Sequence, residues 1–198
     1  LLLSPSSPTQ VALAEPAASP DDEIIYIDAG NFIRVIDPNV EPGAQQITWS
    51  SPDGIWYDFA TGDFNNDGDK EIVAIGGGKL TVFDPVVRDG SIVPDGTPNL
   101  VPWKRLHERA LNNANIIAAG NLDSGAAGDE ILVGYSISGT DYRVDVLKTA
   151  DGGRNWTIHI SQGFGAPWTY IKVGNINNTG SDDLLMGRTT TGDSLVEA

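Results

Sequence analysis

The clearest pattern along the chain is an acidic residue followed directly by a run of apolar residues, and it recurs. The four stretches are DDEIIYIDAG at 21–30, DKEIVAIGGG at 69–78, GDEILVGYSI at 128–137 and SDDLLMGRTT at 181–190. Their aligned acids are Glu23, Glu71, Glu130 and Asp183, which follow one another at about fifty residues. A period of roughly fifty residues is typical of propellers and arrays of stacked units.

Within a unit, the spacing of apolar positions predicts strands. The segment IVAIGGGKLTVFDP at 72–85 contains two β-rich runs joined by Gly77-Gly78, which is a hairpin signal. Apolar and polar residues alternate in RVDVLKT at 143–149, before Asp-Gly-Gly, and again in NWTIHIS at 155–161. The segment WKRLHERALNNA at 103–114 has a helix-like spacing but no clear N-cap, so we predict a short turn or strand end there.

Four short strands and their turns fill a unit of this length, which predicts an all-β fold: a β-propeller of four-stranded antiparallel blades. The units are expected at about 21–52, 53–110, 111–165 and 166–198. The first begins at its second strand and the last ends early, giving about 3.5 blades where closed propellers have ~4–8. We therefore expect the chain to belong to a larger propeller, or to be completed by missing blades or other chains.

Residues 1–20 differ in composition from the repeats. LLLSPSSPTQVALA at 1–14 resembles the end of a secretory signal peptide, and Ala12-Leu13-Ala14 fits the small-x-small rule for cleavage before Glu15. The alternative is a disordered leader rich in Pro, Ser and Ala. A signal-peptide remnant predicts a secreted or cell-surface protein, in the extracellular space or the periplasm.

The charge excludes several partners. The formal net charge is −15 with 12 basic residues, and no basic cluster is visible. Nucleic acids and anionic lipid surfaces both require clustered Lys and Arg, so neither is expected. The chain has no cysteine and two histidines, which argues against thiolate and multi-histidine metal sites. No segment after the leader has the ~20 apolar residues of a membrane span.

The loop GDFNNDGDKEI at 62–72 has the spacing of a cation-binding loop. Counting Asp63 as position 1, side-chain oxygens follow at Asn65 and Asp67, and the sharp turn falls at Gly68. Ca²⁺ takes six to eight oxygen ligands, which short loops supply at alternating positions. A helix-loop-helix site would need a bidentate Glu at position 12, where the chain has Ala74 within an apolar strand. That type of site is excluded.

A loop D-x-[DN]-x-D-G-x-x-[DE] that opens into an apolar strand and recurs along the chain resembles the FG-GAP family of integrin-like (VCBS-like) β-propellers. The resemblance covers about residues 21–198, with one well-preserved loop. It implies a structural Ca²⁺ held by Asp63, Asn65, Asp67, the carbonyl of Asp69, and Glu71. The alternative is an Asx-rich turn whose side chains accept backbone amides.

The corresponding loops of the later units depart from this pattern. In the third, Asn121 and Asp123 match positions 1 and 3, but Gly125 replaces the next acid and one extra residue displaces Glu130. In the fourth, the matching residues are Asn175, Asn177 and Asp183, with two carboxylates lost. Fewer charges mean weaker affinity, so both are expected to be hydrogen-bonded turns or water sites.

A second motif, TADGGRNW at 149–156, resembles the Asp-box turn of propeller sialidases and many non-enzymatic propellers. The resemblance implies that Asp151 accepts backbone amides of the turn, Gly153 supplies an unusual dihedral, and Trp156 packs beneath. In those families the turn is structural and lies away from the active site.

The sequence contains no recognisable catalytic constellation, and its arginines are scattered without a repeat-related position. We therefore expect a non-catalytic extracellular protein that binds a protein or glycan ligand, in adhesion or as a scaffold. Trp56 and Trp168, beside Gly/Pro turns, are candidate ligand-facing aromatics. Two alternatives remain open: an extracellular carbohydrate-active enzyme domain, and a structural subunit of an extracellular or filamentous assembly.

Overall fold

The computed structural model describes residues 23–36, 47–92, 98–190 and 193–197, so the expected leader at 1–20 lies outside the described residues. These residues form strands and turns, and every strand pairing among them is antiparallel. None of the described segments is a helix with the length and apolarity that crossing a bilayer takes. The predicted all-β fold is confirmed.

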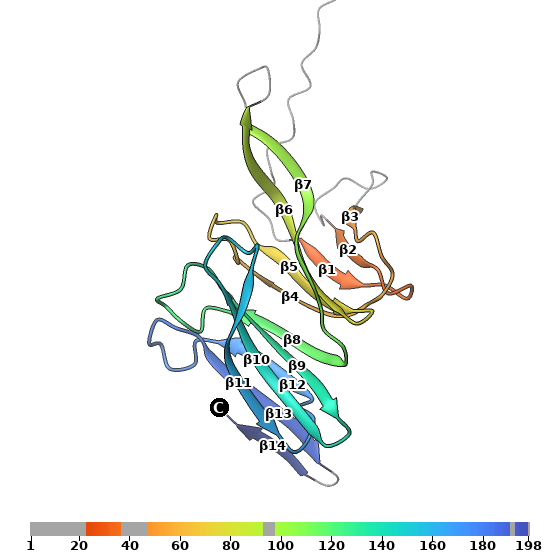
Figure 1. Cartoon of the computed structure of the whole chain (residues 1–198), viewed down its shortest axis with the longest axis vertical. Helices are drawn as coiled ribbons and strands as arrows, with labels where there is room; N and C mark the ends of the chain where they lie inside the picture. Colours follow the sequence, from red (N-terminus) through yellow and green to blue (C-terminus); the bar gives the residue numbers. More distant parts are fainter. Residues whose placement is uncertain (1–22, 37–46, 93–97, 191–192, 198) are drawn as a thin grey trace, which may run out of the picture.

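The described strands form four sheets that follow one another along the chain (Figure 1). Each strand pairs with its sequence neighbour, so each sheet is a meander. The first sheet contains β1 (Ile24–Ile27), β2 (Ile33–Ile36) and β3 (Ile47–Ser50). The second contains β4 (Trp56–Gly62), β5 (Glu71–Gly76), β6 (Lys79–Ile92) and β7 (Pro98–Ala110). The third contains β8 (Ala114–Gly120), β9 (Glu130–Ser138), β10 (Asp141–Thr149) and β11 (Trp156–Phe164). The fourth contains β12 (Tyr170–Gly174), β13 (Asp183–Thr190) and β14 (Asp193–Glu197).

Four-stranded antiparallel sheets are thus present in the second and third units, and three described strands in the others. The limits of the four sheets fall within the four units read from the repeat. A propeller also requires that the sheets close into a ring, and that closure stays a prediction.

Local sequence explains the tight β5–β6 hairpin and the course of β7. Gly77 and Gly78 have φ values of 56° and 76°, the left-handed conformation that a two-residue hairpin turn requires. The helix-like segment at 103–114 is strand through Ala110, because its residues pair with β6 at Thr81↔Glu108. Residues 103–110 are the end of β7 and a turn follows at 112–113, as the prediction of a short turn or strand end has it.

The sheets pack face to face, and β5 shows why its sequence is a continuous apolar run. Ile72 and Ala74 pack in a cluster with the first sheet, whereas Val73 and Ile75 pack in a cluster with the third. All six residues of β5 are buried. A strand covered on both faces loses the alternation of polar and apolar residues, as this one does.

The first strands of successive sheets lie next to one another: β4 contacts β8, and β8 contacts β12. The polar loops that follow these strands therefore gather at the same end of neighbouring sheets. This placement brings the candidate site in the second sheet into contact with the third.

Candidate metal centre

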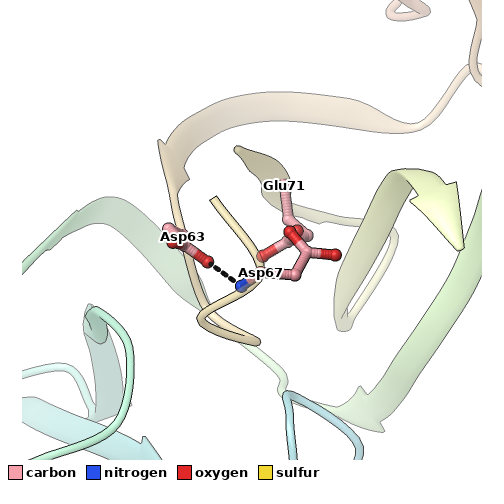
Figure 2. A group of neighbouring side chains, drawn as sticks. All are labelled: Asp63, Asp67 and Glu71. Carbon is pink, nitrogen blue, oxygen red and sulfur yellow. Dashed lines mark hydrogen bonds between the residues drawn. The ribbon is translucent and has the colours of Figure 1, made fainter. Parts of the chain in front are cut away.

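The candidate centre is the turn between β4 and β5, where the side chains of Asp63, Asp67 and Glu71 converge (Figure 2). One carboxylate oxygen from each residue lies within 4.8 Å of the other two. The three side chains come from the end of β4, the middle of the turn and the first residue of β5. Three of the five predicted ligands are therefore brought together.

The turn is also closed by its own hydrogen bonds, as the Asx-turn alternative requires. The amide of Asp67 donates to Asp63 Oδ1 at 3.1 Å and to Asn65 Oδ1 at 2.9 Å. The amides of Gly68 and Asp69 donate to Asp63 Oδ2 at 3.1 Å and Asp67 Oδ1 at 3.0 Å. Gly68 has a φ of 96°, which favours glycine. These bonds orient the carboxylates, and carboxylate oxygens have lone pairs left for a cation.

Glu71 is the buried acid of the candidate centre. Its side chain is 0% exposed, and Oε2 accepts the amides of Phe64 at 2.7 Å and Asn65 at 3.3 Å. The other oxygen, Oε1, is buried with no hydrogen-bond partner among the described residues. Burial raises the pKa of Glu71 to about 8, with a further rise from the charges of Asp84 and Asp67. A buried carboxylate oxygen without a donor is costly unless a cation or proton satisfies it.

Asp84 belongs to the same region although the loop motif does not contain it. It lies on β6, is 2% exposed, and its Oδ2 accepts from Asn65 Nδ2 at 3.4 Å. The same amide group donates to Asp67 Oδ2 at 3.2 Å. Sequence reasoning missed Asp84 because the pairing of β5 with β6, not loop spacing, brings it beside Glu71. The hard oxygen donors and the orphaned Glu71 oxygen fit Ca²⁺, which remains a prediction.

The third unit repeats the backbone arrangement with a different charge. Glu130 is 1% exposed, and its Oε2 accepts the amides of Leu122 at 2.8 Å and Asp123 at 3.1 Å. Its Oε1, like the side-chain oxygen of Asn121, is buried without a hydrogen-bond partner among the described residues. The extra residue shifts Glu130 by one position in the sequence, but Glu130 still accepts the two equivalent amides. Here Lys148 Nζ lies 3.5 Å from Asp123 Oδ2.

The fourth unit closes the same turn with neutral groups. Asp183 Oδ2 accepts the amides of Ile176 at 2.9 Å and Asn177 at 3.2 Å. The side-chain amide of Asn177 donates to the second oxygen, Oδ1, at 2.9 Å. Asn175 at the start of the turn is exposed. Both carboxylate oxygens of Asp183 are satisfied, as expected for a hydrogen-bonded turn.

Two aspartates, Asp129 and Asp182, each lie directly before the repeated acid of a strand and link a loop to the next sheet. Asp129 Oδ2 accepts the amide of Asp63 at 3.0 Å, and the amide of Asp129 donates to the Asp63 carbonyl at 2.8 Å. Asp182 repeats both bonds with Asn121, at 2.9 and 2.5 Å. A Cβ at Gly62 would lie 2.9 Å from Asp129 Oδ2, so glycine there permits the approach. Both aspartates are part of the sequence repeat, but only the packing of neighbouring sheets shows which amides they accept.

The turn that resembles an Asp-box lies against the candidate centre. Asp151 Oδ1 accepts the amide of Asn155 at 2.8 Å, and Gly153 has a φ of 79°. The indole of Trp156 donates to the Gly153 carbonyl at 2.9 Å and meets the ring of Phe64 edge to face at 5.5 Å. Phe64 lies inside the β4–β5 turn of the candidate centre, so the third sheet supports that turn through an aromatic contact.

Trp56 and Trp168 are buried, so the expectation that they face a ligand was wrong. Trp56 is 0% exposed and Trp168 5% exposed, because each packs between two sheets. Two exposed aromatic residues lie close to these tryptophans in sequence: Tyr57 is 49% exposed and Tyr170 60%. A Gly/Pro turn next to a tryptophan therefore does not predict whether the ring lies on the buried or the exposed face of its sheet.

No protein-family model matches the chain, and no curated protein matches its sequence.

Proposed function

We propose that this chain is a non-catalytic extracellular domain of the FG-GAP propeller type, stabilised by one structural Ca²⁺ and used to bind a protein or glycan ligand. The observation that carries the metal part is the buried, unpartnered Oε1 of Glu71 beside the carboxylates of Asp63 and Asp67. The contacts of β8 with both β4 and β12 support the propeller, whose first strands line a common axis.

Asp63, Asp67 and Glu71 would hold the ion, with Asn65 and the Asp69 carbonyl as further oxygen donors. When bound, Ca²⁺ supplies positive charge that offsets the repulsion among these carboxylates. The protein orients the ligands: the Phe64 and Asn65 amides hold Glu71 Oε2, and the loop amides hold Asp63 and Asp67. The consequence is structural, because the same loop carries Phe64 and the Asp129 contacts that attach the third sheet.

The metal claim is tested by binding, with a matched variant from a loop of different charge. Asp67→Ala removes one of the three carboxylates, whereas Asn177→Ala alters the neutral fourth loop. We expect one Ca²⁺ per wild-type chain in a calorimetric titration, one for Asn177→Ala and none for Asp67→Ala. Equal binding by all three proteins would contradict the site.

Ligand binding is supported by exposed aromatic side chains on two first strands that both contact β8. Tyr57 lies near the start of β4 and Tyr170 at the start of β12, and both strands contact β8. Exposed aromatic rings provide apolar area with a polar edge, which suits sugars and protein surfaces. Binding to a glycan array, weakened in Tyr57→Ala and Tyr170→Ala, would support this function. Turnover of glycoside substrates by the purified chain would instead favour the enzyme alternative.

A second candidate, a subunit of a larger assembly, is favoured by the outer face of the fourth sheet. Ile176 corresponds to Phe64 and Leu122, which the following sheet covers, yet Ile176 is 64% exposed. Association through this face would be weakened by Ile176→Asp. A chain that stays monomeric at high concentration in light scattering would exclude this candidate.

A further inference from the structure

We propose that Lys148 acts as the built-in cation of the third loop, and that this strand position selects the occupant of each loop. In the second sheet the position is Asp84, and the loop is left for a divalent cation. In the third it is Lys148, whose ammonium group neutralises Asp123 of the loop. The inference rests on the proposed calcium site in the second loop. Its Lys148 part can also be tested without any metal.

The two positions are equivalent by strand register. Asp84 follows Phe83, which pairs with Ile72, the residue after Glu71. Lys148 follows Leu147, which pairs with Ile131, the residue after Glu130. Each therefore lies on the third strand of its sheet, beside the buried acid that begins the second strand.

The loop residues that they contact are also equivalent. Asn65 and Asp123 each supply the second of the two amides that hold the buried acid. Asp84 accepts from the Asn65 side chain at 3.4 Å, and Lys148 Nζ lies 3.5 Å from Asp123 Oδ2. The loop position and the strand position therefore contact each other in both sheets. In the second sheet they are Asn65 and Asp84, and in the third they are Asp123 and Lys148.

The charges around the two buried acids differ accordingly. Around Glu71 stand the carboxylates of Asp63, Asp67 and Asp84, so the region concentrates negative charge. Around Glu130 the loop contributes Asp123 and Asp129, of which Lys148 pairs with Asp123. Both buried acids keep an oxygen without a hydrogen-bond partner among the described residues. An external cation is needed where the strand position is acidic, whereas a basic residue there neutralises the acid of the loop itself, Asp123.

The fourth sheet gives an independent comparison within the same chain. There Asn177 Nδ2 donates to the second oxygen of Asp183, and the turn has neither an extra acid nor a lysine contact among the described residues. The cation proposed for the second loop, the ammonium group beside Asp123 in the third and the side-chain amide on Asp183 in the fourth thus differ from loop to loop. The occupant varies while the two backbone amides that hold each acid are kept.

The test compares Lys148→Met with Lys172→Met, a lysine on β12 outside the loops. Melting temperatures are measured in EDTA and in Ca²⁺, together with metal stoichiometry from a Tb³⁺ titration. We expect Lys148→Met to melt about 2–4 °C below wild type in EDTA. Ca²⁺ should raise its midpoint by more than it raises that of the wild type, because the vacated third loop then accepts the ion. Lys172→Met should respond to Ca²⁺ as the wild type does.

Two results would overturn the inference: equal melting of the two lysine variants in EDTA, or a loss in Lys148→Met that Ca²⁺ leaves unchanged. The reciprocal variant Asp84→Lys should lose Ca²⁺ binding and melt alike in EDTA and Ca²⁺, with Asp84→Asn as its control. A wild-type Ca²⁺ response retained in Asp84→Lys would also overturn it. If the wild type binds no Ca²⁺, the proposed function fails, whereas Lys148→Met in EDTA still decides the role of Lys148.

Discussion

Replacing Glu71 by Gln isolates the cost of the buried carboxylate when no metal is bound. Glutamine keeps an oxygen that can accept the amides of Phe64 and Asn65, but it carries no charge. Burial, followed by the charges of Asp84 and Asp67, raises the pKa of Glu71 from 4.5 to about 8. The metal-free folded protein therefore holds this proton to a higher pH than the unfolded chain does.

The sign of the pH dependence follows from that difference. Between pH 4.5 and about 8 the folded state binds more protons than the unfolded state, so the free energy of unfolding falls as the pH rises. At ~1.36 kcal/mol for each unit of pKa, the whole window corresponds to about 5 kcal/mol. The part between pH 5 and pH 7 is about 2–3 kcal/mol, a large share of the stability of a typical domain.

Urea unfolding in EDTA at several pH values measures this term. From pH 5 to pH 7 the free energy of unfolding of the wild type should fall by about 2–3 kcal/mol more than that of Glu71→Gln. The other carboxylates with raised pKa values contribute equally to both proteins and cancel in this comparison. Ca²⁺ should remove much of the difference in the wild type, since the ion favours the ionised carboxylate. Parallel pH profiles for wild type and variant in EDTA would refute the reasoning.

Two further predictions concern the contacts between sheets. Phe64→Ala should cost about 3–5 kcal/mol in urea unfolding because its ring is 0% exposed, whereas Ile176→Ala, at 64% exposure, should cost little; equal losses would contradict the packing. Asp129→Ala should cost about 1–2 kcal/mol, because it leaves the part-buried amide of Asp63 without its acceptor, and should speed hydrogen exchange at that amide. Unchanged exchange at Asp63 would argue against the link.

The sequence was sufficient where the physics is local. Gly77-Gly78 predicted the β5–β6 hairpin, because both residues must take positive φ. The spacing from Asp63 to Glu71 placed three carboxylates together, because alternating positions of a tight turn point inward. In each case the residues that decide the structure lie within a few positions of one another.

The sequence was insufficient where strand pairing or sheet packing decides. Asp84 reaches the loop through the β5–β6 register, and Asp129 reaches Asp63 across a sheet boundary. Glu130 keeps its two amides although its loop has an extra residue, because turn length is absorbed in the exposed part of the loop. The burial of Trp56 depends on which face the first sheet covers, which no local pattern specifies.

The central claim is that the second loop holds a structural Ca²⁺, and thermal unfolding of the wild type with Ca²⁺ and with EDTA tests it most directly. The account predicts a clear fall in the melting midpoint in EDTA, restored by added Ca²⁺ and absent in Asp67→Ala. A midpoint that EDTA leaves unchanged in the wild type, and that Asp67→Ala leaves unchanged as well, would contradict it.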